Sequence, residues 1–410
     1  MGLSFLVARR IAFNKSSSFS RFIINIAILA TAISVAVMIL ATALVNGFQQ
    51  VIQQKIFSFW GHIHITQYQP NAGPLTEQIP FQEDNAMVGR LYKLNGISSV
   101  NAYATKSAII KAAKDIEGVI FKGVDRHYNW KNLQQFIQEG RAIQYTDSSY
   151  APEIVISASL AKELQVKLHD PLILYFIQGA GQAPRARKLT IAGIYKTGID
   201  EYDKTYVIGD LELVRKLNNW QPGDIGGYEI FITNYKQMNE VSLTADKIMP
   251  DKLFIRTIKE IYPNVFDWLQ LQNQNEIIIL IIMTIVAIIN MTTAILILIL
   301  ERTNMIGIVK ALGMRNANIQ KIFIYQAGYI VLAGLLLGDV LGIGIAVLQQ
   351  HTGFFKLPEE SYYMSVAAIS LHWWEVALIN IGTFVICLLV LIVPSMVIRR
   401  ITPVKAIQFK

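Results

Sequence analysis

Cysteine is almost absent from this sequence of 410 residues, which contains a single one, Cys387. It lies within an apolar stretch, so the large polar middle of the chain has no cysteine with which to form a disulfide. A region of about 225 residues is long enough to bury an apolar core of its own. We therefore expect the middle of the chain to be stabilised by ordinary packing.

Nucleotide-binding and catalytic motifs are missing as well. A P-loop needs a Gly-Lys pair to hold phosphates, and no Gly-Lys dipeptide occurs anywhere in the sequence. The HExxH, CxxC and GxSxG patterns are also absent. The sequence therefore predicts a subunit that is not an enzyme and that holds no cofactor or metal. If the protein uses ATP and Mg²⁺, a partner subunit must bind them.

Charged side chains are absent from residues 277–300, a stretch of 24 residues. A helix of that length extends about 36 Å, which exceeds the roughly 30 Å of a bilayer's hydrocarbon core. Residues 22–46, 322–348 and 376–398 have the same character, with Asp339 as the one charge inside them. The sequence therefore predicts a membrane protein with four transmembrane helices.

Basic residues are concentrated in three short segments, residues 1–21, 301–321 and 399–410. These segments contain 12 of the 37 basic residues but only 1 of the 29 acidic ones, so the whole net charge of +8 comes from them. Short segments rich in Lys and Arg stay on the cytoplasmic side, which predicts that both termini are cytoplasmic. The basic isoelectric point thus reflects topology and not nucleic-acid binding.

The predicted architecture is four transmembrane α-helices with a large α+β extracytoplasmic domain between the first two. Its boundaries are a cytoplasmic amphipathic leader (1–21), the first span (22–46), the outer domain with helical stalks (47–275), the second span (276–300), a basic amphipathic cytoplasmic helix (301–320), the third span (321–348), a short outer loop (349–374), the fourth span (375–398) and a cytoplasmic tail (399–410). Alternating and helical apolar patterns are mixed in the outer domain, which indicates the α+β class.

One loop of the outer domain, residues 178–188, is rich in glycine and basic residues between two apolar runs. Its composition predicts a long, protruding hairpin tip. The candidate contact residues are Gln178, Gly181, Pro184, Arg185 and Arg187. The tip is either a docking loop for a partner or a merely solvated hairpin.

Other polar residues have simple structural interpretations. His62 and His64 are compatible with two metal ligands on one face of a strand, but no further His or Cys is close in sequence, which favours a structural role. The adjacent Glu359 and Glu360 are interpreted as a solvated pair and not as an acid/base dyad.

Asp339 is the carboxylate inside the third span. Such a group is costly in a membrane and is usually paired or functional. Gly338, Gly342 and Gly344 flank it and permit close helix contact. We favour a structural hydrogen bond or a water-facing position, with a role in coupling or proton handling as the alternative.

The segment ERTNMIGIVKALGM, directly after the second span, resembles the signature of the FtsX-like permeases of ABC transporters. The matching residues are Glu301, Arg302, Thr303, Ile306, Gly307, Lys310, Ala311, Leu312 and Gly313. In that family the segment is the coupling helix, which sits in a groove of the ATP-binding subunit. The alternative for Glu301 and Arg302 is a solvated interfacial pair. Residues 401–410 also resemble the family's closing Pro-x-x-Ala motif.

The first third of the chain is similar to the lipoprotein-releasing branch of this family, the Lol transmembrane subunits. Asn46, Gly47 and Phe48 fill the Asn-Gly-Phe motif that precedes the stalk in that branch. The segments FKGVD and ISASLAKELQVKLHDPLIL follow the pattern of its periplasmic core domain, except that His169 occupies a position where glycine is customary.

The resemblance implies an inner-membrane permease that extracts acylated lipoproteins and passes them to a periplasmic chaperone, driven by ATP hydrolysis in a separate subunit. Two copies, or this chain and a sibling permease, would enclose a lipid cavity between their first and second spans. Its implied wall comprises Ile39, Ala43, Phe48, Ile278, Ile282 and Ile285. The 178–188 loop corresponds to the chaperone-gripping hook. The implied partners are the ABC ATP-binding subunit, the second permease, the lipoprotein, the chaperone and membrane lipids.

A different function is compatible with the same features. A mechanotransmission permease of the FtsX or MacB type would use ATP to move its outer domain and drive a periplasmic partner, without transport through its spans. The length of the outer domain and the protruding basic loop favour lipoprotein release.

Overall fold

The computed structural model describes residues 18–69, 78–112, 115–146, 149–179 and 181–400. Most of the predicted leader and the tail from residue 401 onward lie outside these residues. The chain divides into two compact units. We call them the helical unit (Met1–Gln50, Trp268–Lys356 and Val366–Lys410) and the sheet unit (Val51–Asp267 and Leu357–Ser365).

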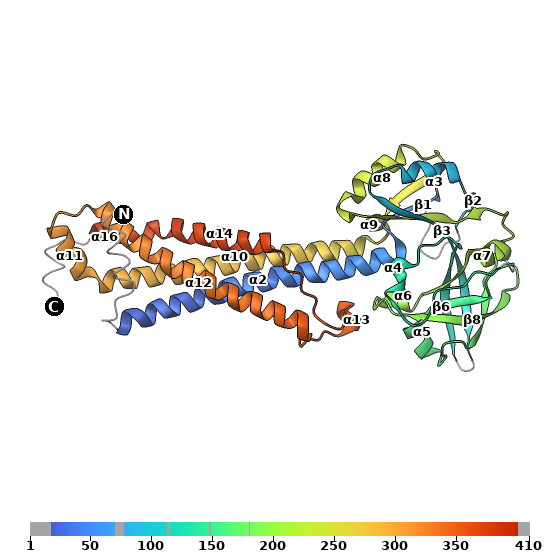
Figure 1. Cartoon of the computed structure of the whole chain (residues 1–410), viewed down its shortest axis with the longest axis horizontal. Coiled ribbons are helices and arrows are strands. Elements are labelled where there is room, and N and C mark those ends of the chain that lie inside the picture. The colour runs from blue at the N-terminus through green and yellow to red at the C-terminus, as the bar shows by residue number, and fades with distance from the viewer. Residues whose placement is uncertain (1–17, 70–77, 113–114, 147–148, 180, 401–410) are drawn as a thin grey trace. The chain divides into compact units, whose positions relative to one another are not determined.

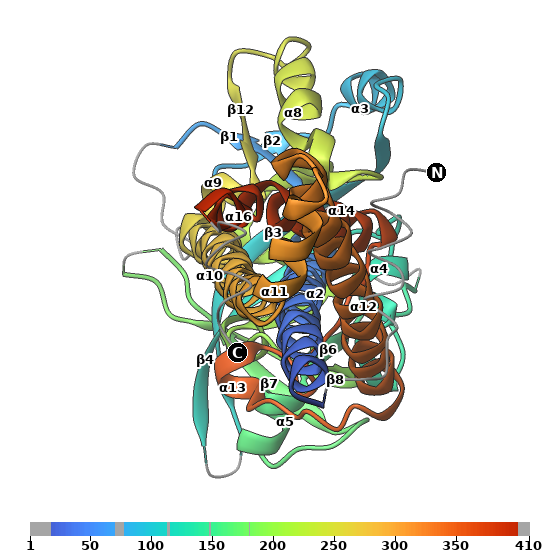
Figure 2. The ribbon, with the colours of Figure 1, turned by 90° about the vertical axis from the view of Figure 1, so that its left-hand side faces the viewer.

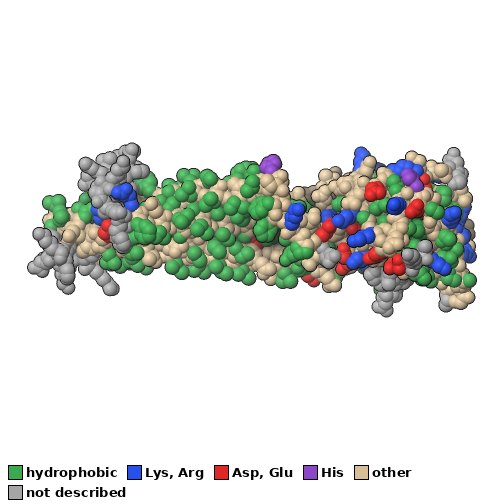
Figure 3. All heavy atoms as spheres, turned by 90° about the horizontal axis from the view of Figure 1, so that it is seen from below, with side chains coloured by type: hydrophobic (Ala, Val, Ile, Leu, Met, Phe, Trp, Pro, Cys, Tyr) green, Lys and Arg blue, Asp and Glu red, His purple; other side chains and the backbone are tan. Residues whose placement is uncertain are grey.

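Four long helices dominate the described part of the helical unit (Figure 1): α2 (Ser18–Trp60), α10 (Pro263–Glu301), α12 (Asn316–Thr352) and α14 (Trp373–Val390). Four helical segments are long and apolar enough to cross a membrane, as predicted: Arg21–Trp60, Pro263–Glu301, Asn316–Thr352 and Trp373–Arg399. On the face seen in Figure 3, hydrophobic side chains cover these helices. Viewed along them, α2 lies between α10 and α12 (Figure 2). Both α2 and α10 continue without a break beyond the predicted spans, as the predicted stalks require.

The fourth span is not one continuous helix. Because Pro394 has no N–H, it cannot donate to the carbonyl of residue 390, and α14 ends at Val390. Two short helices follow, α15 (Ile392–Ser395) and α16 (Val397–Arg400).

Glycines of α12 allow close contact with α2. A Cβ on Gly338 would lie 2.7 Å from Val35 Cβ and 2.8 Å from the Ala32 carbonyl oxygen. Gly334 and Gly342 meet α2 in the same way, one turn to either side, so the three form a GxxxGxxxG row. Gly344, which the sequence also suggested for helix contact, has no neighbour within 4 Å of its Cβ position among the described atoms. Its predicted role in packing is therefore wrong, and Gly334 takes its place.

The sheet unit is built on a ten-stranded mixed sheet in the order β12-β1-β11-β3-β4-β9-β6-β8-β5, with β7 paired to β3 and β8. Its strands are β1 (Ile63–Gln67), β3 (Ile97–Lys111), β4 (Ile116–Val124), β5 (Ile137–Gly140), β6 (Glu153–Ser157), β7 (Pro171–Phe176), β8 (Arg185–Tyr195), β9 (Tyr206–Asp210), β11 (Gly227–Ile232) and β12 (Leu253–Thr257). A separate two-stranded sheet pairs β2 (Phe81–Gln82) with β10 (Asp224–Ile225).

Short helices complete the sheet unit: α3 (Asn85–Tyr92), α4 (Lys131–Gln134), α5 (Ala158–Glu163), α6 (Asp200–Asp203), α7 (Leu211–Asn218), α8 (Met238–Asp246), α9 (Ile258–Ile261) and α13 (Glu359–Tyr362). The sequence of α7 shows why they form. The Asp210 side chain accepts from Glu212 N and caps the first turn, and Asn219 ends the helix in a left-handed conformation. Strands and helices therefore mix along the chain, and the predicted α+β class is confirmed.

His169 has a φ of +68°, in the left-handed region. Glycine reaches this region without steric cost, whereas a side chain with a Cβ is strained there. This conformation explains why the sequence pattern favours glycine at the position that His169 occupies.

The predicted outer loop 349–374 is divided between the two units. Its middle, Leu357–Ser365, which includes α13, belongs to the sheet unit, and the residues before and after it belong to the helical unit. In the sheet unit, Lys196 Nζ lies 2.7 Å from Glu359 Oε2, and Lys55 Nζ donates to the Tyr363 carbonyl at 2.6 Å. Glu359 is thus a partly exposed carboxylate in an ion pair with Lys196.

Candidate functional site

The junction between the second and third spans contains a separate short helix. Helix α10 ends at Glu301, Arg302 leaves the helical conformation, and α11 runs from Thr303 to Ala311. Gly313 then adopts a φ of +89°, which glycine tolerates best. Its N–H donates to Lys310 O and that of Met314 to Val309 O, which is the bond pair of a Schellman motif. The amphipathic helix predicted over residues 301–320 is thus only nine residues long, and α12 begins at Asn316.

The predicted coupling residues fall on two faces of this junction. Ile306 and Gly307 are buried against the chain's own helices. Lys310 Nζ donates to the Ile398 carbonyl at 2.7 Å, and Arg302 is half-buried. The exposed residues of the predicted set are Glu301, Ala311, Leu312 and Gly313. Through these contacts Ile306, Gly307 and Lys310 hold α11 against other parts of the same chain.

Two apolar side chains of the junction point away from the chain. Leu312 is 81% exposed and Ile308, four residues earlier, is 53% exposed. Because residues four apart lie on one side of a helix, they form a single apolar face. The family signature did not include Ile308. Its spacing from Leu312 was the available signal.

The predicted hairpin tip is a turn between β7 and β8, which pair antiparallel from Pro171↔Thr190 to Phe176↔Arg185. Arg185 and Arg187 lie on β8 and not in the loop. Arg185 Nη1 donates to Leu217 O at 3.0 Å, at the C-terminal end of α7, where a positive charge is favourable. Arg185 therefore has a structural partner, and the prediction that it belongs to the free tip is wrong. Gly181 and Pro184 are exposed, and Gln178 is half-buried.

The predicted lipid-facing residues separate in the same way. Ile39 and Ala43 are each 1% exposed and pack within the helical unit. Phe48 packs edge-to-face on Trp268, with ring centroids 5.1 Å apart. The remaining three, Ile278, Ile282 and Ile285 of α10, are about half exposed. Of the six predicted wall residues, the three on α10 are the exposed ones, so the placement of Ile39 and Ala43 on an open wall is wrong.

The histidines have structural partners in the sheet unit. His62 Nδ1 accepts from Ile232 N at 3.2 Å, and His64 Nδ1 lies 3.0 Å from Tyr103 Oη. Burial lowers the pKa of His62 to about 4 and that of His64 to about 3, so both are neutral near pH 7. No group of three or more metal-ligating side chains occurs among the described residues. The favoured structural role of both histidines agrees with this packing.

Asp339 joins two helices. Asn380 Nδ2 of α14 donates to Asp339 Oδ1 at 2.8 Å and to Val376 O at 3.0 Å. The favoured structural hydrogen bond is therefore present.

Comparisons with known protein families agree with this arrangement of spans, junction and sheet. Residues 26–239, more than half of the chain, match the MacB-like periplasmic core domain. Residues 277–403 match the FtsX-like permease C-terminal family. The chain therefore belongs to the FtsX-like ABC transporter permeases with a MacB-like periplasmic core domain. It is a multi-pass protein of the bacterial inner membrane, and its large domain is periplasmic.

Full-length relatives come from the branch that the first third of the sequence resembles. The lipoprotein-releasing system transmembrane protein LolC of Neisseria meningitidis serogroup B is 22% identical, and the match covers 100% of this chain and 98% of that protein. The corresponding protein LolE of Haemophilus influenzae is 22% identical over 92% of each chain. The predicted resemblance to Lol transmembrane subunits is confirmed.

Two solved structures are similar to part of the chain at lower identity. The periplasmic region of MacB from Actinobacillus actinomycetemcomitans is 14% identical with a TM-score of 0.35, covering 50% of this chain and 92% of that one. The extracellular domain of the ABC-type transporter YknZ from Gram-positive bacteria is 16% identical with a TM-score of 0.31, covering 48% of this chain and 99% of that one.

Proposed function

We propose that this chain is the permease subunit of an ABC transporter that extracts acylated lipoproteins from the inner membrane and passes them to a periplasmic chaperone. Similarity to Lol proteins over nearly the whole chain favours this function over mechanotransmission without transport. The sequence has no P-loop, so a separate subunit hydrolyses the ATP. The basic segments support a cytoplasmic position for both termini and α11, on the side where such a subunit would bind.

The observation that carries the proposal is the exposed apolar face of α11. Ile306 and Gly307 fix the helix to the chain's own core, while Ile308 and Leu312 are left uncovered. A short helix with apolar anchors on one face suits a groove on another protein. Because α11 connects α10 directly to α12, a displacement of α11 by the ATPase would act on both spans.

The lipid path follows from the open face of α10. Ile278, Ile282 and Ile285 are spaced four and three residues apart, so they form one stripe along the helix. With a second permease facing this stripe, the two chains would enclose an apolar space for acyl chains. ATP-driven closure would then move the lipid toward the periplasmic side.

The β7–β8 turn is the proposed contact for the chaperone. Its exposed residues include Gly181 and Pro184, and a Cβ at Gly181 would meet no described atom within 4 Å. Deletion of residues 181–184 spares Arg185 and its contact with α7. We expect this deletion to abolish capture of the chaperone by the purified chain. Unchanged capture would remove the docking role from the turn.

Depletion of the protein tests lipoprotein release directly. We expect acylated lipoproteins to accumulate in the inner-membrane fraction when membranes are separated by density. An unchanged distribution of lipoproteins between the two membranes would contradict the proposed function.

Leu312→Glu tests the coupling face. A charge at this anchor should weaken co-purification of the ATPase about tenfold or more and reduce its stimulated turnover. Leu243→Glu is the matched control, because Leu243 is 68% exposed on α8 in the sheet unit. If Leu312→Glu retains both ATPase binding and turnover, α11 is not the coupling element.

A further inference from the structure

Residues 367–372 lead into α14 and form neither helix nor strand. We call this segment the strap. It belongs to the helical unit and passes directly over Gly47 of α2. A Cβ on Gly47 would lie 2.4 Å from the Ala368 carbonyl oxygen and 2.7 Å from Ile369 N. Only glycine therefore leaves room for the strap at this position of α2.

Hydrogen bonds from two helices hold the strap. On α2, the Ala43 carbonyl accepts from Ser370 N at 2.9 Å. On α12, Gln350 Nε2 donates to Ile369 O at 2.9 Å, and the buried Gln349 donates to another strap carbonyl at 3.1 Å. Irregular backbone beside a membrane needs such partners, because lipid cannot satisfy its polar groups. The strap is thus tied to both α12 and α2.

A polar contact also fastens the place where the strap enters α14. Asn46 Nδ2 of α2 donates to Glu375 Oε2 at 2.5 Å, and His372 Nδ1 lies 3.4 Å from the same Asn46 nitrogen. A hydrogen bond to a carboxylate is about twice as strong as one between neutral groups. This bond joins α2 to the first turn of α14, directly after the strap.

The Asn-Gly-Phe motif of the sequence makes three different contacts in this region. Asn46 donates to Glu375, and Gly47 leaves space for the strap. Phe48 packs on Trp268 of α10. Three consecutive residues therefore connect α2 to α14, to the strap and to α10. They do so at the end of the first span, shortly before α2 continues into the sheet unit.

The strap covers apolar residues of α2. Ile39 and Ala43 are each 1% exposed, whereas Leu44, the next residue, is 40% exposed. Ile39 and Ala43 line a narrow seam together with residues of the strap and of α14, Leu371 and Val376 among them. Without the strap, this seam would be open to lipid at the periplasmic end of the span.

We propose that the strap, fastened by the Asn46–Glu375 bond, seals the periplasmic end of the first span against lipid, so that acyl chains meet α10 and not α2. Asn46 and Glu375 are then positioning residues for the lipid path, because they act through the strap. The part of this proposal that concerns lipoprotein acyl chains rests on the proposed function. The seal against membrane lipid does not.

The test uses a phospholipid with a diazirine in its acyl chains, in nanodiscs that contain the full-length chain. After illumination, fragment mass spectrometry gives the label on Ala43 relative to that on Leu44, its exposed neighbour. The natural chain should carry label on Leu44 and almost none on Ala43. Comparable label on both residues would overturn the proposal. Because no lipoprotein takes part, a failure of the proposed function does not alter this result.

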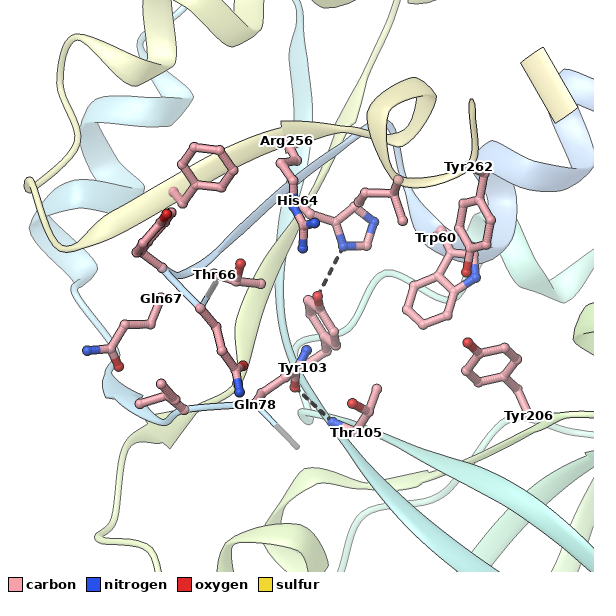
Figure 4. Close-up of a pocket in the computed structure, with 16 residues that line it drawn as sticks. Trp60, His64, Thr66, Gln67, Gln78, Tyr103, Thr105, Tyr206, Arg256 and Tyr262 are labelled. Carbon is pink, nitrogen blue, oxygen red and sulfur yellow. Dashed lines mark hydrogen bonds between the residues drawn. The ribbon is translucent and has the colours of Figure 1, made fainter. Parts of the chain in front are cut away.

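The sheet unit supplies the background level for this measurement. It contains a cavity of about 140 Å³ whose wall is rich in aromatic rings, and Figure 4 shows several of them around His64 and Tyr103. An apolar probe that left the bilayer could collect in this cavity, whereas a probe held in acyl chains would not reach the periplasmic domain. Label on Tyr103 therefore measures labelling from outside the bilayer and is subtracted from that on Ala43.

Variants of Glu375 test the bond that fastens the strap. Glu375→Ala removes the acceptor and should raise the label on Ala43 toward that on Leu44. Glu375→Gln keeps an oxygen that can accept from Asn46, so its label on Ala43 should stay low. Glu276→Ala, at the start of the predicted second span, is the control and should leave the ratio unchanged. An unchanged ratio in Glu375→Ala, or an equal rise in Glu375→Gln, would contradict the role of this bond.

Gly47→Ala displaces the strap by a different route. Its Cβ would overlap the Ala368 carbonyl, so the strap must shift although Asn46 and Glu375 are unchanged. The label on Ala43 should rise as it does in Glu375→Ala. This variant also decides the matter if Glu375→Ala does not fold, as judged by its thermal transition. A folded Gly47→Ala protein with no rise in label on Ala43 would overturn the seal.

Discussion

The first and second spans have nearly the same mean hydropathy but different surroundings. In the most apolar window of α2, 44% of the residues are buried, against 17% in that of α10. Ile39 of α2 is 1% exposed, whereas Ile282 of α10 is 49% exposed. Apolar composition alone therefore does not tell which span is packed inside the chain and which is open to a partner or to lipid.

The difference originates in α12. Its GxxxGxxxG row, Gly334, Gly338 and Gly342, brings the backbone of α12 against α2, with Thr31, Val35 and Ala36 on the other side. In a membrane, such close van der Waals contact is a main source of helix association, because lipid is as apolar as the side chains. Ile278, Ile282 and Ile285 of α10 are about half exposed among the described residues. In the proposed function, this stripe is the face that a second permease and acyl chains would meet.

Gly338→Leu should have the largest effect on this comparison. The new side chain would overlap Val35 and the Ala32 carbonyl, so the α2–α12 contact must open. Overpacking of this kind costs about 3 kcal/mol or more when the backbone has to move. We expect the purified variant to unfold at a much lower temperature in detergent than the natural chain.

Gly344→Leu on the same helix is the control, because no described atom lies within 4 Å of its Cβ position. Its thermal transition should stay close to that of the natural chain. Equal losses in the two variants would mean that leucine itself, and not the contact with α2, is the cause.

A matched pair of isoleucines compares the two spans directly. Ile39→Ala removes buried packing and should cost about 2–5 kcal/mol of unfolding free energy. Ile282→Ala, at a half-exposed site, should cost less than about 1 kcal/mol, because little buried surface is lost. The measurement is thermal unfolding of both variants in the same detergent.

If α10 lines the lipid path, contact with lipoprotein should rank the two positions in the opposite order to stability, with Ile282 above Ile39. A photoreactive residue at Ile282 should crosslink to lipoprotein, while one at Ile39 should crosslink within the chain. Lipoprotein crosslinks at Ile39 would show that the α2 face opens during transport and would weaken the distinction between the two spans.

Much of this arrangement follows from sequence alone, and the exceptions share a physical cause. Charge-free stretches identify the four spans, because a bilayer demands them of any sequence. The side of a helix that a residue faces depends on tertiary packing, which is why the sequence suggests Gly344 and not Gly334 for helix contact and Ile39 for the cavity wall. Likewise, the family signature locates α11 but does not separate Ile306, which is buried, from Leu312, which is exposed.

Arg185 illustrates the same limit in the sheet unit. A basic residue beside Gly and Pro is typical of a solvated loop, and composition supports that interpretation. The C-terminal end of α7, whose carbonyl oxygens attract Arg185, lies about 30 residues further along the chain. Such a distant partner leaves no local signal in the sequence.

Asp339→Asn should have the smallest effect on stability. It tests the contact of α12 with α14, whereas Gly338→Leu tests the contact of α12 with α2. Asn380 reaches Asp339 from α14, and an asparagine oxygen can still accept this bond. Polar contacts between transmembrane helices contribute only about 0.6 kcal/mol on average, so the thermal transition should hardly move and lipoprotein release should persist. A strong loss of release with unchanged stability would instead assign Asp339 a functional charge. In that case α12 would connect two active faces, and its glycine contact with α2 would be only part of its role.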